Sequence, residues 1–315
     1  MAAFILRRFL MLIATLFVAS LIVFAVLEIV PGDPARLMLG LNASEDAIEA
    51  LRNEMGLNQP IIPRYVSWVG GLLIGDFGTS YTYRVAVSEL VTERIVVSLP
   101  LAILALALST SIALPVALLA ARHRGTSADT AIMTATQVGV AIPNFWFALL
   151  LVYLFAVTLQ WVPAVGFPGW GDDPAGSLTA LILPAIALAL PQAAILSRVT
   201  RSALLEALSQ DYIRTARAKG VAEGDVLWKH ALRNALIPVL TILGLQFAFL
   251  LAGTIIIENV FTLPGLGRLI FQAITQRDLI VVQSVVMLLV VTVISINFLV
   301  DIAYAWADPR LRGQR

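Results

Sequence analysis

The chain has 315 residues, of which 59% are hydrophobic and only 13% are charged. Soluble globular proteins carry roughly 25% charged residues, so this composition indicates an integral membrane protein. The net charge of +1 gives no indication of nucleic acid binding. The sequence contains no cysteine, which excludes a disulfide framework and a cysteine-based metal site.

Long uncharged runs predict the membrane-spanning helices. A helix needs roughly 20 apolar residues to cross the hydrocarbon core of a bilayer. Six runs reach this length, and they are 9–27, 95–121, 130–171, 174–197, 234–257 and 279–300. The third of these is strongly apolar only over its first two-thirds. The sequence therefore predicts an all-α polytopic membrane protein with six transmembrane helices. The first run is expected to be an uncleaved anchor, because no small-residue cleavage site follows it.

Prolines inside these runs are expected to kink the helices, since proline removes a backbone hydrogen bond and clashes with the preceding turn. They are Pro115, Pro143, Pro184 and Pro191.

The Lys and Arg residues predict the orientation. They precede the first run at Arg7 and Arg8, and they gather in 122–124, in 198–233 and at the C-terminal tail. Cytoplasmic loops carry an excess of Lys and Arg, so both termini are expected in the cytoplasm. Residues 28–94 are then expected outside the cytoplasm. This segment contains arginines, but the charge bias has little effect on the orientation of loops longer than about 60 residues.

The segment between the first two runs has structure of its own. Residues 44–55 show helical spacing of apolar residues, with Ser44 as the expected cap and Pro60 and Pro63 as the expected stop. Tyr65, Trp68 and the apolar residues 72–74 predict a patch on the membrane surface. A packed cap with no binding role is the alternative.

The stretch Asp211-Tyr212-Ile213-Arg214-Thr215-Ala216-Arg217-Ala218-Lys219-Gly220 lies between two long apolar runs. It is expected to form a short helix, because Ser209 or Asp211 can cap its start and Gly220 can end it in a left-handed conformation. The small side chains of Ala216 and Ala218 would let another protein approach the backbone. The basic side chains in the stretch would suit an acidic partner surface.

Several chemistries are disfavoured. The two histidines, His123 and His230, fall in predicted loops, so a membrane protease is poorly supported. The cores of the six runs contain no Asp, Glu, Lys or Arg, apart from Glu28 and Asp301 at their ends, which disfavours an ion-driven carrier. Neither lysine is followed by Ser or Thr, so no P-loop can be formed and any ATP must be hydrolysed by a partner.

Residues 211–220, continued by His230-Ala231-Leu232-Arg233-Asn234-Ala235-Leu236-Ile237-Pro238, resemble the coupling-helix region of ABC-importer permeases. Gly220 matches the family glycine, whereas Arg214-Thr215-Ala216 stands where Glu-Ala-Ala is usual and keeps only the last alanine. His230-Ala231-Leu232-Arg233 occupies the position of Ile-x-Leu-Pro, and a proline appears only at Pro238. This departure is typical of the dipeptide, oligopeptide and nickel branch of the family.

Three further stretches are similar to the B-type subunit of that branch. They are Val30-Pro31-Gly32-Asp33-Pro34 after the first run, Glu258-Asn259-Val260-Phe261 with Pro264-Gly265-Leu266-Gly267, and Asp301 through Asp308-Pro309-Arg310. The similarity covers essentially the whole chain.

The resemblance implies a type I ABC importer permease fold in a bacterial or archaeal inner membrane. Its domain scheme is an anchor helix over 1–30, an extracytoplasmic segment over 31–94, and a permease core over 95–309 with a coupling loop at 198–235. The subunit would itself be no enzyme and hold no cofactor or metal. Its expected partners are a second homologous permease, two subunits that bind ATP and magnesium, an extracytoplasmic solute-binding protein and membrane lipid.

The resemblance also implies site residues and cargo. Residues 211–220 would couple to the ATPase. The residues expected in this role are Asp211, Tyr212, Arg214, Thr215, Ala216, Arg217, Ala218, Lys219 and Gly220. Glu258, Pro264, Gly265 and Gly267 are possible gate or outer-loop residues. Peptides are the expected cargo, and nickel, glutathione or sugar conjugates are alternatives. A stand-alone carrier or channel and a membrane-embedded assembly factor are weaker alternatives.

Overall fold

The computed structural model describes residues 2–29, 33–39, 43–163 and 166–307. In these ranges the ordered elements are helices, together with one isolated antiparallel bridge between Thr79 and Ala86. The predicted all-α class is therefore confirmed. Of the stretches that carry the family resemblance, residues 30–32 and 308–310 lie outside the described residues.

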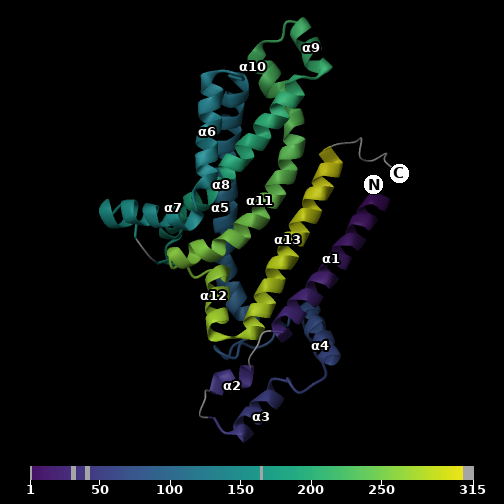
Figure 1. Cartoon of the computed structure of the whole chain (residues 1–315), viewed down its shortest axis with the longest axis vertical. Helices are drawn as coiled ribbons and strands as arrows, with labels where there is room; N and C mark the ends of the chain where they lie inside the picture. Colours follow the sequence, from purple (N-terminus) through teal and green to yellow (C-terminus); the bar gives the residue numbers. More distant parts are fainter. Residues whose placement is uncertain (1, 30–32, 40–42, 164–165, 308–315) are drawn as a thin grey trace. The chain divides into compact units, whose positions relative to one another are not determined.

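The chain divides into two compact units, whose helices are labelled in Figure 1. The core unit comprises Met1–Leu6, Ser98–Leu263 and Ile296–Arg315, and the N-terminal unit comprises Arg7–Val97 and Pro264–Ser295. The long helices α5 (Val87–Arg122) and α13 (Leu279–Ala307) contribute to both units. These units are defined by contacts between residues, whereas the predicted domains 1–30, 31–94 and 95–309 are defined by hydropathy. The predicted domain boundaries therefore stay predictions.

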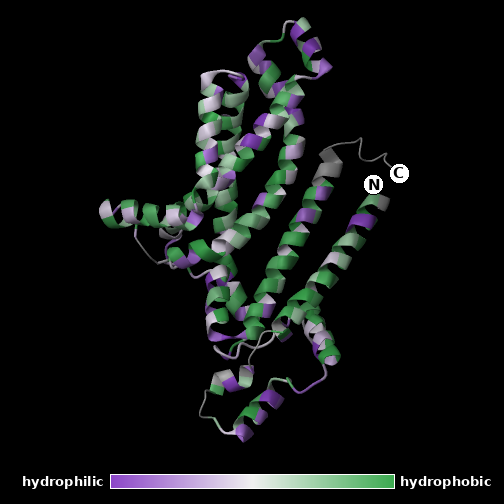
Figure 2. Cartoon of the chain, viewed as in Figure 1, coloured by the Kyte–Doolittle hydropathy of each residue, from purple (hydrophilic) through white to green (hydrophobic). Residues whose placement is uncertain are grey.

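Five helices in the described ranges are long and apolar enough to cross a bilayer. They are α1 (Ala2–Ile29), α5, α8 (Pro174–Leu208), α11 (Leu232–Val260) and α13. Their residues are predominantly hydrophobic, as the colours in Figure 2 show. Each contains one of the predicted apolar runs, because uninterrupted apolar sequence of this length satisfies its backbone hydrogen bonds as a helix in lipid.

The third predicted run, 130–171, does not form one straight helix. It covers most of α6 (Ser127–Ala141), together with α7 (Asn144–Leu151) and the π-helix η1 (Val152–Thr158). The chain bends by 92° between α6 and α7. Pro143 lies at this break and cannot supply the backbone donor that would continue α6. Six spans result only if the bent pair counts as one.

The centre of the core unit is the packing of α8 on α6 and α11. Alanines make up much of the buried face of α8, which lets the neighbouring backbones approach closely. Gly253 of α11 contributes in the same way, since a Cβ atom there would lie 3.1 Å from Leu188 Cδ2. The prolines Pro184 and Pro191 are accommodated inside the continuous helix α8.

At one end of the core unit, α6 is tied to α8 by an ion pair. Asp129 accepts hydrogen bonds from Arg201 Nε (2.8 Å) and Nη2 (2.6 Å), and from the backbone N–H of Gly125 (3.0 Å). A bidentate carboxylate–guanidinium pair fixes direction as well as distance. It therefore fixes the short connection between α5 and α6 against α8.

The first part of the N-terminal unit also includes the short helices α2 (Pro34–Leu39), α3 (Glu45–Glu54) and α4 (Ile61–Ile74). The predicted helix at 44–55 is confirmed as α3, and Ser44 Oγ accepts from the Ala47 N–H as its cap. Pro60 and Pro63 do not end this helix. They begin α4, because proline is preset for the first helical turn, where its missing N–H needs no partner.

Helix α4 rests on α1 through aromatic side chains. The rings of Tyr65 and Trp68 lie 5.4 and 5.9 Å from the ring of Phe24, and the Tyr65 hydroxyl is 2.8 Å from Ser20 Oγ. Leu73 and Ile74 are each 83% exposed. Only part of the predicted interfacial patch is therefore exposed. Its aromatic residues pack inside the N-terminal unit, whereas its aliphatic residues Leu73 and Ile74 are exposed.

Candidate functional site

The predicted short basic helix is α9 (Asp211–Ala218), and it lies beyond the ends of α8 and α11 in the core unit (Figure 1). Its cap differs from the prediction. Gln210 occupies the N-cap position without a side-chain hydrogen bond, Ser209 ends α8, and Asp211 is already the first helical residue. The negative charge of Asp211 still favours this end, since a helix N-terminus carries a partial positive charge.

Gly220 ends the helix as predicted, in the left-handed conformation with φ of +79°. The Gly220 N–H donates to the Arg217 carbonyl (2.9 Å), and the Val221 N–H donates to the Ala216 carbonyl (3.2 Å). These two bonds form a Schellman motif, which satisfies carbonyls that the end of the helix leaves free. Val221 also packs against the hydrophobic cluster beneath the helix, so the chain turns sharply back at this point.

One face of α9 is anchored in the core unit. Ile213 is fully buried and Ala216 is 8% exposed, and Ile213 belongs to a cluster formed by α5, α8, α9, η2 (Val226–Ala231) and α11. The structure corrects the expectation for Ala216. Its side chain faces its own protein, so its small size serves packing within the chain and does not expose the backbone to a partner.

The other face of α9 is polar and open. The residues of the predicted coupling stretch that are exposed are Asp211, Tyr212, Arg214, Thr215, Arg217, Ala218, Lys219 and Gly220. Asp211 and Arg214 form a surface ion pair of 3.2 Å, and Lys219 has no ion pair within the described residues. Figure 2 shows hydrophilic residues in α9, beyond the ends of largely hydrophobic helices.

Two side-chain contacts fasten α9 to the helices that come after it in the chain. Arg217 donates to both carboxylate oxygens of Glu223 in α10 (Glu223–Asp225), at 2.7 and 3.0 Å. Asn234 Nδ2 of α11 donates to the Tyr212 hydroxyl at 3.0 Å. Together with the buried Ile213, these contacts connect α9 to α10 and α11.

The Arg217–Glu223 pair persists at neutral pH. The hydrogen bond from Arg217 lowers the pKa of Glu223 below its ordinary value, and Glu223 raises the pKa of Arg217. A carboxyl group whose pKa is lowered by folding stabilises the fold above its unfolded pKa. That contribution is lost only as the pH falls through the lowered pKa of Glu223, in the acidic range.

Glu258, a predicted gate residue, is fully buried near the end of α11. It accepts a hydrogen bond of 2.5 Å from Ser98 Oγ of α5. A buried carboxylate is costly unless hydrogen bonds compensate it, and this contact ties the two helices together. The sequence did not identify Ser98 as a partner, because 160 residues separate the two. A gating role for Glu258 stays a prediction.

The residues Pro264, Gly265 and Gly267 stand at the start of α12 (Leu266–Gln276). Gly265 is the N-cap, and its carbonyl accepts from the Leu269 N–H at 3.1 Å. Gly267 is buried. These residues therefore form the capped start of a short amphipathic helix, and their part in gating stays a prediction.

Asp278 is a residue that the sequence reasoning missed. It is buried between α12 and α13 and accepts from Ser80 Oγ (2.5 Å), from the Thr82 N–H (3.0 Å) and, as the N-cap of α13, from the Val281 N–H (3.3 Å). An Asp just before an apolar run is an N-cap signal that could have identified its local role. Its partners in loop 80–82 lie 196 to 198 residues away in sequence.

His, Asp and Glu side chains in the described ranges are the residues that could bind a metal ion. In those ranges, no three His, Cys, Asp or Glu side chains gather as they would around a metal ion. His123 and His230 lie in the loop after α5 and in η2, and the His123 ring contacts the Leu119 carbonyl at 2.9 Å.

Comparison with known families gives two adjoining matches. Residues 113–313 match the model described as "Binding-protein-dependent transport system inner membrane component". Residues 1–103 match the corresponding N-terminal model, "Binding-prot-dependent transport system membrane comp, N-term". The two matches together account for nearly the whole chain.

Relatives of full length are similar throughout. The "Putative peptide transport system permease protein" of Brucella abortus (strain 2308) is 45% identical over 312 residues, which is 99% of each chain. The "Probable peptide ABC transporter permease protein" of Sinorhizobium fredii is 38% identical over 99% of this chain and 100% of its own. The "Glutathione transport system permease protein GsiC" of Escherichia coli (strain K12) is 39% identical over 99% of each.

Solved structures agree in fold. The inward-facing MetNI methionine ABC transporter has a chain that aligns with a TM-score of 0.56 at 20% identity, over 70% of this chain and 96% of its own. An amino acid ABC transporter crystallised with histidines has a chain that aligns with a TM-score of 0.54 at 18% identity, over 69% of this chain and 94% of its own. The expected type I importer permease fold is thereby confirmed.

Proposed function

The chain belongs to the family of binding-protein-dependent transport system inner membrane components, and from this premise we propose that it forms half of the translocation path of an ATP-driven importer. It is a multi-pass membrane subunit of the permease type. The catalytic work of ATP hydrolysis belongs to partner subunits in this proposal, since neither lysine of the sequence lies in a P-loop pattern.

The observation that carries the proposal is the construction of α9. Its inner face is buried through Ile213, which packs in the hydrophobic cluster of the core unit. Its outer face is polar, and it lies in the connection between α8 and α11. A helix transmits force between sites only if a partner can bias it between two positions. A short helix anchored in this way can receive the movement of an ATPase subunit and pass it to the spans on either side.

The partners follow from this role. We propose a second homologous permease that completes the path, two ATP-binding subunits on the α9 side and an extracytoplasmic solute-binding protein on the other side. ATP and magnesium would be held by the ATP-binding subunits, with no cofactor in this chain. The exposed Arg214 and Lys219 favour an acidic groove as the site that receives α9.

Peptides are the proposed cargo. The similarity to relatives named as peptide permeases over essentially the full length supports this choice. Glutathione, itself a tripeptide, is a second candidate because a glutathione permease is 39% identical over 99% of the chain. Nickel and sugar conjugates stay alternatives, although the relatives named for peptide and glutathione transport do not support them.

We expect no ATPase activity from the purified chain alone. The complete importer, assembled with the co-encoded permease, ATP-binding subunits and binding protein, should hydrolyse ATP and take up peptide into proteoliposomes. Radiolabelled peptide uptake and phosphate release measure the two activities. Steady hydrolysis by the chain alone, in a preparation free of contaminating ATPases, would contradict the proposal.

We also propose that both termini and α9 face the cytoplasm, whereas α2, α3 and α4 lie outside. The native chain contains no cysteine, so a single introduced cysteine reports its own side. Asp46 and Gly224 are exposed, and a Cβ atom at Gly224 meets nothing within 4 Å. In intact cells a membrane-impermeant maleimide should label Asp46→Cys and not Gly224→Cys. The reverse pattern would overturn the orientation.

A further inference from the structure

The N-terminal unit contains a cavity of about 650 Å³, lined by charged and aromatic side chains, that the proposed mechanism does not use. It lies among the end of α1, the α3–α4 connection, α4, the loop after α4 and the start of α13, all within this unit. Its size falls in the range of small-molecule sites in proteins. It can hold a ligand of a few amino-acid residues.

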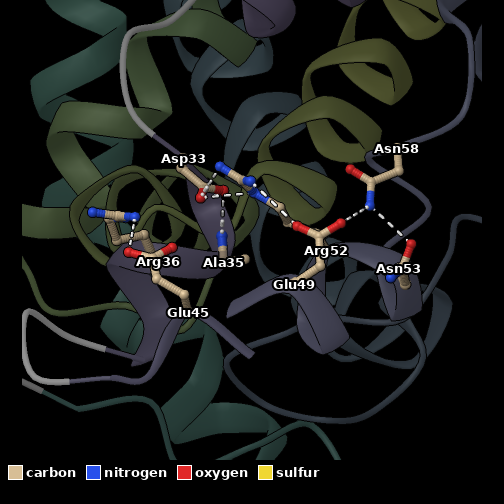
Figure 3. Close-up of polar contacts among 8 residues, drawn as sticks. All are labelled: Asp33, Ala35, Arg36, Glu45, Glu49, Arg52, Asn53 and Asn58. Atoms are coloured by element: carbon tan, nitrogen blue, oxygen red, sulfur yellow. Dashed lines mark hydrogen bonds and ion pairs between the residues drawn. The ribbon is translucent and has the colours of Figure 1, made fainter. Parts of the chain in front are cut away.

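The cavity is lined by three carboxylates and two guanidinium groups, so one carboxylate has no cationic partner. Arg52 donates to Asp33 from Nε at 2.9 Å and also contacts Glu49, as Figure 3 shows, and Arg64 donates to Glu28 at 2.9 Å. The cation of each pair is thereby occupied. Asp76 has no cationic partner within the described residues, and the one hydrogen bond that its carboxylate accepts there comes from the Gly78 N–H at 2.9 Å. The cavity therefore has a net charge of −1.

Asp76 is held in place by its backbone. Gly75 ends α4 in the left-handed conformation, with φ of +82°, and the Asp76 N–H donates to the Gly71 carbonyl at 2.9 Å. The loop that follows is fastened to the start of α13, because Ser284 Oγ donates to the Phe77 carbonyl and Asp278 accepts from Ser80. A fixed carboxylate loses little freedom when it binds a ligand, which favours affinity.

The rest of the lining suits an organic cation that also carries a carbonyl group. Phe24, Trp68, Phe77 and Tyr81 line the cavity, and aromatic rings attract cations through their faces. The indole N–H of Trp68 is enclosed and has no acceptor in the described part of the chain. An enclosed donor without an acceptor is destabilising, so a ligand carbonyl that reached it would gain affinity.

We propose that this cavity binds the amino-terminal residue of the transported peptide, with the α-ammonium group at the Asp76 carboxylate. The inference rests on the proposed peptide function and adds a recognition site within the permease subunit. Such a site would hold the cargo after its release from the binding protein. It would also favour peptides with a free amino terminus over blocked ones.

Direct binding tests the proposal without the binding protein, which would make its own selection. The probes are alanylalanine and N-acetyl-alanylalanine, added to the importer complex of two permeases and two ATP-binding subunits in phosphatidylcholine nanodiscs. We expect alanylalanine to bind and the acetylated probe to bind at least about tenfold more weakly, because a charge-assisted hydrogen bond is lost. Asp76→Asn should weaken alanylalanine binding by about the same factor.

Matched variants separate recognition from folding. Asp46 is an exposed carboxylate outside the cavity, so Asp46→Asn should bind alanylalanine as the native complex does. Gln283 lines the cavity, and Gln283→Lys should weaken binding by adding a cation, which keeps the test decisive even if Asp76→Asn does not assemble. Asp76→Glu should retain most of the affinity because it keeps the charge.

The outcomes also separate this inference from the proposed function. Equal binding of both probes, or undiminished binding by assembled Asp76→Asn and Gln283→Lys complexes, overturns the inference while peptide uptake still supports the function. Binding that disappears when phosphatidylethanolamine is added to the nanodiscs would assign the cavity to the lipid ammonium group and overturn the peptide site. An importer that takes up no peptide contradicts the function itself.

Discussion

Gly220→Glu is expected to abolish transport while the protein remains inserted and assembled. Gly220 has φ of +79°, and any residue with a Cβ atom is strained there by about 1–2 kcal/mol. A Cβ atom at this position meets nothing within 4 Å. The chain itself therefore leaves room for the larger side chain, and its bulk and negative charge would act on the ATPase surface that we propose receives α9.

Variants at three sites separate strain from partner contact. Gly220→Asn should transport nearly normally, because asparagine tolerates the left-handed conformation better than most residues. Gly125 also has a positive φ, of +77°, and a Cβ atom there meets nothing within 4 Å. Gly125→Ala therefore measures the effect of backbone strain alone, and the effect of Gly220→Ala is compared with it. Ser127→Glu places the same acid at an exposed helix start and should be tolerated.

The measurements are peptide uptake, ATPase stimulation by the loaded binding protein, and complex assembly by size-exclusion chromatography. The expected result for Gly220→Glu is an assembled complex with neither uptake nor stimulation. Normal uptake with normal stimulation would show that 211–220 is an ordinary solvated connection. A complex that fails to assemble for Gly220→Glu but forms for Gly220→Asn still places a partner at this surface.

Ile213→Ala is expected to uncouple ATP hydrolysis from transport. Ile213 is fully buried in the cluster that fixes α9 to α5, α8, η2 and α11. Truncating a buried isoleucine to alanine costs roughly 2–5 kcal/mol, which is large compared with the two exposed side-chain contacts that would still hold the helix. The helix could then move under the ATPase without moving the spans.

Ile213→Val is the matched control, since its expected cost is only about 0.5–1.5 kcal/mol. We expect this variant to keep most of its transport, and Ile213→Ala to retain ATPase activity with little uptake. Hydrogen exchange of residues 211–221 should rise in Ile213→Ala and change little in Ile213→Val. Coupled transport at the native rate by Ile213→Ala would show that force does not pass through this anchor.

Local features of the candidate site could be predicted because they depend on short-range chemistry. Gly220 was expected to end α9 in the left-handed conformation, and Ser44 was expected to cap α3, and both are confirmed. The predicted cap of α9 and the predicted roles of Pro60 and Pro63 were wrong. Asp, Ser and Pro each suit more than one position at a helix end, so residue type alone does not select the boundary.

The sequence by itself determined that the protein is helical and lies in a membrane. Apolar runs of this length form helices in lipid, because a helix satisfies the backbone hydrogen bonds within the segment. It also determined the family, through motifs spread over the whole chain. Only the tertiary structure decided which face of α9 is open, that Ala216 faces inward, and that the third run bends by 92° at Pro143. Only the tertiary structure brought Ser98 to Glu258, Ser80 to Asp278 and Asp76 to an aromatic cavity. The reason is physical: these contacts join residues far apart in sequence, and their pairing follows from how the helices pack, which no local pattern records.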